Sequence, residues 1–340
     1  MFKKIILIGP CSNKKNKTYT GGTIILFEEL ISWLKFKNKT YTIIDCNKKN
    51  YKNKLIAFVE IILQSIKNIP FHDTVSFHGT SRDFLYLALF IVVISKLFRK
   101  KITLRKFAGN FDKVYSSSSF LTKKIYGFSL RNADCLFFET KYLVEFGLRF
   151  NEKCYWLPNT RMNPLCSFVG KSNTFSKRFV FMSHIKKTKG IFELLDAFSK
   201  LDETYTLDMY GVIDNDICFD QIKKINIRYV SALTPDQVLE NLSLYDVLIL
   251  PSYEEGYPGI IIEALSLGIP VISTNVGGVP EIYTDGVEGY IVEPRNAVQL
   301  LESIKKINNI NYGFLSKNAL ERFKIFDSNL VYSEIENKIF

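Results

Sequence analysis

Apolar runs of four to six residues recur along the chain and are separated by longer segments with helical spacing of apolar positions. Strands that alternate with helices in this way predict parallel sheets built from βαβ units. The predicted strands are Lys4–Ile8, Tyr41–Ile44, Thr74–Phe77, Ile102–Leu104, Cys135–Phe138, Phe179–Met182, Leu207–Tyr210, Ile227–Tyr229, Val247–Leu250 and Val271–Ser273.

The pattern divides into two halves. The clearest helix is Gly190–Leu201, and the segment Cys154–Phe168 carries two prolines that break regular structure and predicts a hinge. We therefore expect an α/β fold of two doubly wound domains, residues 1–160 and 161–325. Ligands of such sheets bind outside the carboxyl ends of the strands, so a cleft between the domains is the expected active site.

The longest apolar block is Phe84–Phe98, which is interrupted by Ser95 and Lys96. It is shorter than the ~20 residues that span a bilayer, so it predicts a buried helix, with a membrane-inserting helix as the alternative. No transmembrane segment is expected. The opening MFKKIILIGPCS predicts a first buried strand, because its apolar run is too short for a signal peptide.

Composition agrees with a globular protein, since 47% of the 340 residues are hydrophobic. Its six cysteines stand singly with no CxxC pair, which favours buried thiols in a reducing compartment over disulfides. They are Cys11, Cys46, Cys135, Cys154, Cys166 and Cys218.

Charge is divided unevenly. Up to Leu165 there are 28 Lys+Arg against 11 Asp+Glu, a net charge of +17, and the remainder carries −6. Anionic lipid headgroups or nucleic acid would both suit the basic half. No nucleic-acid-binding motif accompanies it, so we expect no nucleic-acid partner. The alternative is that part of the lysine excess is solvated surface with no partner.

The stretch EEGYPGIIIEALSLGIPVI, from Glu254 to Ile272, places two carboxylates beside an apolar run. Glu255 is expected in the loop at the carboxyl end of a strand, and Glu263 about two turns on, in the following helix. Carboxylates accept from hydroxyl groups, so the two together can hold a polyol. Gly256 and Gly259 leave room for a ligand to reach backbone amides. The structural alternative is helix capping and a surface-facing Glu.

Lys186, Lys187 and Lys189 precede Gly190, which opens a helix. Cations beside a helix N-terminus predict anion binding, and a solvated lysine run is the alternative. Gly21 and Gly22 likewise lie between the first strand and a helix. They predict either a phosphate-binding loop or only a turn.

Other motifs give weaker evidence of function. Gly170-Lys171-Ser172 ends like a P-loop, but Leu165 stands where that pattern requires Gly. Asp214-Asn215-Asp216 has the spacing of a metal-chelating DxD, although a solvated loop is favoured. The three histidines have no metal-ligand spacing, so no metal site is predicted.

The block from Ser183 to Pro294 resembles the GT4-type glycosyltransferases, which have the two-domain GT-B fold and transfer sugar with retention. The resemblance lies in KG at Lys189–Gly190, PSYEEGYPGIIIEALSLGIPVIST, VGGVPEI and DGVEGYIVEP. The E-x7-E pair corresponds to Glu255 and Glu263. The first half is similar more loosely, through the GG loop, VSFHGT and LPNTR.

The resemblance implies that the second domain binds a nucleoside diphosphate sugar without a metal or other cofactor, with UDP-sugar favoured over GDP-sugar. Glu263 would hold the ribose and Glu255 the donor sugar, while Lys189 and the Gly21–Gly22 loop would neutralise the diphosphate. Glu255 and Lys189 are thus the catalytic candidates. The other implied donor-binding residues are Gly256, Tyr257, Pro258, Gly259 and Ile260.

Two positions depart from the family. His184 stands where an Arg is usual, and Lys106 lies in the region of a usual His. His184 is kept as a donor-binding candidate, and His78, Arg105 and Lys106 as acceptor-side candidates. The resemblance also implies that residues 326–340 form a helix that crosses back to the first domain.

We therefore expect a metal-independent retaining glycosyltransferase of the hexosyl- or N-acetylhexosaminyltransferase type. Its acceptor would be a lipid-linked glycan or an oligosaccharide in the synthesis of capsule, lipopolysaccharide or another cell-surface polysaccharide. It would be cytoplasmic and peripheral on the anionic inner face of the cytoplasmic membrane. The alternative is a non-catalytic nucleotide-sugar-binding subunit of the same fold.

Overall fold

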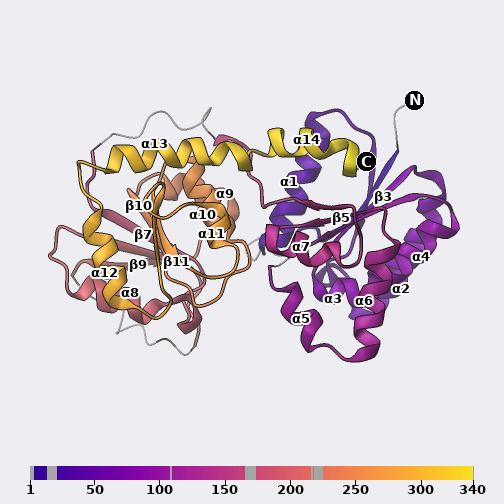
Figure 1. The fold of residues 1–340 in the computed structure, drawn as a ribbon, viewed down its shortest axis with the longest axis horizontal. Helices are drawn as coiled ribbons and strands as arrows, with labels where there is room; N and C mark the ends of the chain where they lie inside the picture. The colour runs from indigo at the N-terminus through magenta and orange to yellow at the C-terminus, as the bar shows by residue number, and fades with distance from the viewer. Residues whose placement is uncertain are drawn as a thin grey trace. The chain divides into compact units, whose positions relative to one another are not determined.

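The computed structural model describes residues 4–13, 21–107, 109–164, 174–215, 217 and 225–339. The chain forms two compact units (Figure 1). The first comprises Met1–Thr160 together with Ser328–Phe340, and the second comprises Arg161–Asp327.

The described residues of the first unit form a six-stranded parallel sheet of order β2-β1-β3-β4-β5-β6. Its strands are β1 (Ile5–Gly9), β2 (Tyr41–Asp45), β3 (Thr74–Gly79), β4 (Lys101–Lys106), β5 (Cys135–Phe138) and β6 (Cys154–Trp156). The longer helical elements are α1 (Gly22–Phe36), α2 (Lys54–Asn68), a π-helical turn η3 (Phe84–Ala88), α4 (Leu89–Leu97), α6 (Phe120–Asn132), α7 (Lys141–Leu148) and α14 (Ser328–Ile339). Shorter ones are η1 (Lys48–Asn50), η2 (Ile69–Phe71), α3 (Ser81–Asp83) and α5 (Phe111–Ser117).

The run IILIG of β1 is buried throughout because helices cover both faces of the sheet. Alternate side chains of a strand point to opposite faces, and the core divides accordingly. Ile6 and Ile8 pack in one hydrophobic cluster with side chains of α2 and α4. Ile5 and Leu7 pack in the other, with side chains of α1 and α14.

Helix α14 packs beside α1 within the first unit (Figure 1). Tyr332 is fully buried there, and its ring lies 5.5 Å from that of Trp33. The last helix therefore completes the hydrophobic core of the first unit.

The described residues of the second unit form a six-stranded parallel sheet of order β12-β11-β10-β7-β8-β9. Its strands are β7 (Arg178–Met182), β8 (Thr206–Tyr210), β9 (Ile227–Ser231), β10 (Val247–Leu250), β11 (Val271–Thr274) and β12 (Gly289–Val292). The helical elements are η5 (Lys187–Lys189), α8 (Ile191–Ser199), α9 (Pro235–Leu242), α10 (Gly259–Ser266), α11 (Val279–Ile282), α12 (Ala297–Lys306), α13 (Tyr312–Phe323) and η7 (Lys324–Phe326). Both units are therefore doubly wound α/β layers, as predicted.

All ten predicted strands are present, and the structure adds β6 and β12. The prediction that Cys154–Phe168 is all hinge was wrong at its start, because Cys154–Trp156 pairs with β5. Residues 165–168 of that segment lie outside the described residues, as do the P-loop-like Gly170, Lys171 and Ser172 and also Asp216.

The block Phe84–Phe98 is not one uniformly buried helix. It begins as the π-helical turn η3 and continues as α4, and large apolar side chains on its outer side are exposed. Tyr86, Phe90, Val93 and Leu97 are 55%, 43%, 38% and 74% exposed. In the part of the chain that the structure describes, no helix is both long and apolar enough to cross a membrane.

Candidate active site

The order of strands in the second sheet locates a crevice. From β7 the chain builds β8 and β9 on one side, and it then returns to build β10, β11 and β12 on the other. The connections that leave β7 and β10 thus diverge, and the carboxyl ends of two such strands are where doubly wound sheets bind ligands. Lys189 follows β7 and Glu255 follows β10.

Lys189 and Glu255 are in direct contact. The Lys189 Nζ lies 2.5 Å from Glu255 Oε1, and both side chains are mostly buried, with exposures of 16% and 11%. Ser252 Oγ donates to the same oxygen at 2.6 Å. This hydrogen-bonded ion pair fixes both side chains at the switch point, 66 residues apart in sequence.

The backbone holds the two loops together. Tyr253 N donates to Thr188 O at 2.9 Å. Gly190 has φ +71°, and a Cβ at this position would lie 2.0 Å from Pro251 O. Only glycine tolerates both the left-handed conformation and this close approach. The predicted helix start at Gly190 is therefore a cap, and α8 begins at Ile191.

The loop after β11 supports Glu255 from another direction. Gly278 N donates to Gly256 O at 2.7 Å. Gly277 has φ +54°, and a Cβ there would lie 1.9 Å from Glu255 O. A glycine at position 277 is thus required for this packing, which fixes the backbone of the EEGYPG loop.

Glu263 lies in the second turn of α10, which confirms the prediction that it follows in a helix. Its Oε1 accepts from Arg161 Nε at 2.7 Å, and the two side chains are only 13% and 11% exposed. The guanidinium also lies over the start of α10, since a Cβ on Gly259 would be 2.3 Å from Arg161 Nη2. The positive end of the helix dipole disfavours a cation such as Arg161 near the N-terminus of α10. The negative charge of Glu263 compensates this unfavourable interaction.

Each of the two carboxylates keeps one oxygen available. Among the described residues, the side-chain hydrogen bonds of Glu255 and Glu263 all involve Oε1, and Oε2 of each has no hydrogen-bond partner. A carboxylate oxygen accepts from hydroxyl groups, and the first N–H groups of a helix bind anions. The site therefore combines two hydroxyl acceptors, one ammonium and the α10 N-terminus.

The remaining donor-side candidates vary in exposure. Tyr257 and Pro258 are buried, and Pro258 is the N-cap of α10. Ile260 and Gly256 are half-buried, while His184 is exposed in the loop after β7. His184 makes no contact with Lys189 or either glutamate in the described residues, so its donor-binding role stays a prediction.

Gly21 and Gly22 belong to the first unit, at the start of α1. Both are exposed, and a Cβ on either would meet no atom within 4 Å. Neither glycine is thus required by packing, and the phosphate-binding role stays a prediction.

The acceptor-side candidates His78, Arg105 and Lys106 are each only 1% exposed. Arg105 donates to Tyr332 Oη at 3.3 Å and to Pro158 O at 3.2 Å. Ser76 Oγ lies 2.8 Å from His78 Nε2. All three side chains are held inside the first unit, so contact with an acceptor stays a prediction.

Burial lowers the pKa of two of these groups. It lowers the pKa of the Lys106 ammonium to about 8, against the opposing effect of Glu139 and Asp83. Burial, with Arg105 nearby, also holds the pKa of His78 well below its usual value. His78 is consequently neutral at physiological pH.

Sequence reasoning missed Arg161 and Ser252 as parts of the site. Arg161 belongs to the LPNTR segment noted for its resemblance, but it lies 102 residues from Glu263. Ser252 belongs to the PSYEEG motif and was not singled out. Nothing in the sequence spacing pairs Arg161 with Glu263, whereas Ser252 stands only three residues before Glu255.

Comparison with known proteins shows which proteins the chain is similar to. Residues 167–322 match the family "Glycosyl transferases group 1". The chain is 25% identical over 303 residues to an "Uncharacterized 41.2 kDa protein in cps region" of Klebsiella pneumoniae, covering 84% of this chain and 83% of that one. It is 34% identical to the putative teichuronic acid biosynthesis glycosyltransferase TuaC of Bacillus subtilis over 128 residues, which are 37% of this chain and 32% of TuaC.

A solved structure shares the fold. Anabaena HepE in complex with UDP aligns with a TM-score of 0.71 at 15% identity, over 99% of both chains. The predicted GT-B class, with its two Rossmann-like domains, is thereby confirmed. The segment that carries Glu255 and Glu263 thus matches the glycosyl transferases of group 1.

Proposed function

We propose that this protein is a retaining, metal-independent glycosyltransferase that moves a hexosyl or N-acetylhexosaminyl group from a nucleoside diphosphate sugar to a glycan acceptor. The observation that carries the proposal is the Lys189–Glu255 ion pair at the switch point of the second sheet. It places a fixed cation and a hydroxyl-accepting carboxylate side by side where a doubly wound sheet binds its ligand.

The donor side follows from the chemistry of the available groups. Glu263 Oε2 accepts from the ribose hydroxyls, and Glu255 Oε2 accepts from a hydroxyl of the donor sugar. Lys189 and the first amides of α10 stabilise the charge that develops on the diphosphate as the glycosidic C–O bond breaks. UDP is the favoured nucleotide, since the structurally similar HepE binds it.

Transfer forms one bond and breaks one. The acceptor hydroxyl oxygen bonds to the anomeric carbon as the nucleoside diphosphate leaves. We assign the acceptor's proton to the departing phosphate oxygen on the same face of the sugar, which accounts for retention. Losing one preorganised stabilising group at such a site costs about 10²–10³ in rate.

For the acceptor we propose a lipid-linked glycan at the inner face of the cytoplasmic membrane. Two observations support this. One relative is named for its place in a cps region, and another for teichuronic acid biosynthesis. The first unit is also strongly basic, with 28 Lys+Arg against 13 Asp+Glu, whereas the second has 17 against 21.

The second candidate is a non-catalytic subunit that binds the same donor. The observation favouring it is His184, which stands where the family usually has Arg. Such a subunit binds UDP but releases none from UDP-sugar with any acceptor.

Thermal unfolding with UDP, GDP, ADP and CMP tests donor binding. A nucleotide at 100 times its Kd adds about 2.7 kcal/mol to the free energy of unfolding, a readily measured shift. We expect UDP to stabilise the wild type and to lose this effect in Glu263→Gln. Glu254→Gln is the matched control, because Glu254 is exposed in the same loop.

Release of UDP from UDP-sugars in the presence of membrane extract then separates the two candidates. We expect turnover in the wild type, a loss of about 10²–10³ in Glu255→Gln, and an unchanged anomeric configuration in the product. UDP binding equal in Glu263→Gln and Glu254→Gln would contradict the donor assignment. UDP binding without turnover would favour the non-catalytic subunit.

A further inference from the structure

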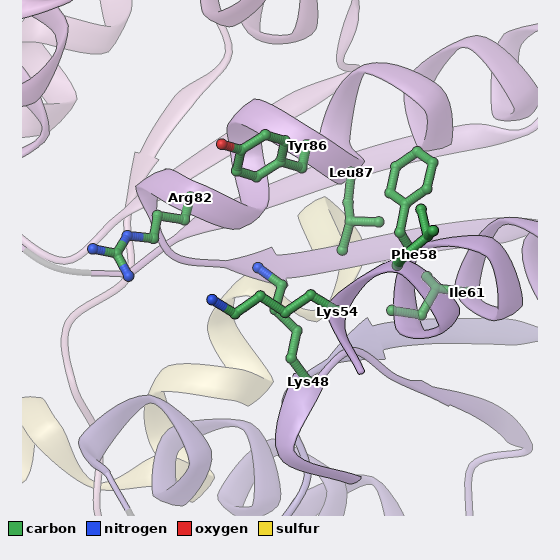
Figure 2. Close-up of a pocket in the computed structure, with 8 residues that line it drawn as sticks. Lys48, Lys54, Phe58, Ile61, Arg82, Tyr86 and Leu87 are labelled. Carbon is green, nitrogen blue, oxygen red and sulfur yellow. The ribbon is translucent and has the colours of Figure 1, made fainter. Parts of the chain in front are cut away.

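A groove of about 530 Å³ lies in the first unit, between α2 and the π-helical turn η3 (Figure 2). Its volume is in the range of small-molecule sites. The lining residues are Lys48, Lys54, Leu55, Phe58, Ile61, Arg82, Tyr86 and Leu87. None of them belongs to the donor site, which lies in the second unit.

The groove lies on the edge of the sheet where ligands bind. Lys48 follows the end of β2 by three residues, and Arg82 follows the end of β3 by three. These strands flank β1 on either side. The groove is thus lined by residues that follow the carboxyl ends of two strands, and doubly wound sheets bind ligands outside these ends.

One end of the groove is cationic. Figure 2 shows the tips of Lys48, Lys54 and Arg82 toward the same side of the groove, together with the Tyr86 hydroxyl. Lys48 Nζ pairs with Asp83 at 3.1 Å. Lys54 and Arg82 are exposed and have no ion pair among the described residues. The surplus of two cations suits a dianion, and Arg supplies the fork geometry that matches phosphate.

The other end is apolar. Figure 2 shows Phe58, Ile61 and Leu87 on the side away from the charged tips. Ile61 and Leu87 are buried in the core, and the Phe58 ring lies 5.3 Å from that of Phe90. Leu55 lines the groove although it is 73% exposed. An apolar wall of this kind accepts hydrocarbon rather than a second polar group.

The outer face of α2 continues this apolar character. Leu55, Val59, Leu63 and Ile66 recur at helical spacing and are all exposed. Such a stripe beside cations is typical of a helix that lies against the membrane interface. A ligand with a hydrocarbon chain would therefore reach the groove from the bilayer.

We infer that this groove binds one phosphate ester carried on a hydrocarbon chain. The phosphate lies between Lys54, Arg82 and Lys48, and the first carbons of the chain lie against Phe58, Ile61 and Leu87. Identifying this ligand with the lipid of the acceptor rests on the proposed function, whereas the binding chemistry rests on the groove alone.

Calorimetric titration of the full chain with decyl phosphate, below its micelle concentration, tests the inference. Inorganic phosphate distinguishes a site for free anions, and an uncharged decyl tetraethylene glycol ether distinguishes a merely apolar groove. We expect decyl phosphate to bind at least tenfold more tightly than either.

Variants then locate the site. Lys54→Glu and Arg82→Gln should each weaken decyl phosphate binding about tenfold, and Leu55→Ser should weaken it severalfold. Lys67→Glu is the matched control, because Lys67 is an exposed lysine near the other end of α2. It should leave the affinity within twofold.

Three results would overturn the inference: inorganic phosphate binding as tightly as decyl phosphate, the uncharged ether doing so, or equal effects of Lys54→Glu and Lys67→Glu. Thermal shift with UDP on the same samples keeps the two proposals apart. A protein that binds decyl phosphate but no nucleotide would overturn the donor assignment and support the groove.

Discussion

At the scale of single residues, both site glutamates are already paired with cations of their own unit. Glu255 contacts Lys189 at 2.5 Å, and Glu263 contacts Arg161 at 2.7 Å. Removing one partner of a mostly buried pair leaves an uncompensated charge, which destabilises the fold. Replacing Glu by Gln keeps the size of the side chain and one acceptor oxygen. It is therefore more informative at this site than a truncation of the side chain.

His78 gives a pH-dependent prediction for the wild type. Burial holds its pKa in the folded chain well below the usual value of about 6.5 that applies when the chain unfolds. Below that pH the unfolded chain binds the extra proton, so the stabilising contribution is present above pH 6.5 and is lost as pH falls. The free energy of unfolding should fall by up to about 1.4 kcal/mol per pH unit from this group.

Urea denaturation between pH 7.5 and 5 measures this slope. His78→Gln should be less stable at pH 7.5, since His78 is buried against Ser76, but its slope should be flatter. His184→Gln is the control, because it retains His78 and should retain the slope. Parallel slopes in the wild type and His78→Gln would contradict the prediction.

At the scale of secondary-structure elements, α14 is tied to three other parts of the first unit by Tyr332. Its hydroxyl accepts from Arg105 on β4 at 3.3 Å and from Thr160 Oγ1 at 3.1 Å, and its ring packs on Trp33 of α1. The helix is thus held by polar contacts as well as by apolar burial.

Tyr332→Phe should lower the free energy of unfolding by about 1–3 kcal/mol, because the buried Arg105 and Thr160 lose a partner. Tyr142→Phe is a matched control, since Tyr142 is 58% exposed and donates to Asp112 on the surface. It should change stability by less than about 0.5 kcal/mol. Equal losses in the two variants, measured by urea denaturation, would mean that α14 is held by apolar packing alone.

Elements with long apolar runs were predictable from the sequence, and short ones were not. The runs of β1, β7 and β10 are buried on both faces and stand out by composition alone. The three-residue β6 lies just before Pro158, and β12 opens with a glycine, so neither has a strand signal. The π-helical η3 shares the spacing of an ordinary helix.

The site was predictable only in part, because the sequence shows local motifs but not contacts between distant residues. The EEGYPG motif located Glu255 and Glu263, but their cations lie 66 and 102 residues away. Sequence spacing carries no information about such distant pairs, which depend on the order of strands in the sheet. The burial of Arg105 and Lys106 at the end of β4 was missed for the same reason, since the residues that cover them come from other elements.

At the scale of the whole molecule, positive charge is concentrated in the first unit. That unit also carries the exposed apolar stripes of α2 and of η3 with α4. An anionic bilayer attracts each nearby Lys or Arg by about 1 kcal/mol, and the apolar side chains add burial in the interface. The proposed peripheral attachment therefore has an electrostatic part and an apolar part, which respond differently to salt.

Co-sedimentation with vesicles separates these parts. The bound fraction should rise with the share of phosphatidylglycerol and be low on phosphatidylcholine alone. It should fall as NaCl is raised from about 0.1 to 1 M, because the screening length shortens from about 10 to 3 Å. Some binding should remain at high salt through the apolar side chains. Leu63→Ser should reduce this remaining binding further, since Leu63 is 60% exposed on α2. A bound fraction that changes with neither the salt concentration nor the lipid charge would contradict attachment through the basic unit. It would mean that electrostatic attraction to anionic lipids does not contribute to binding.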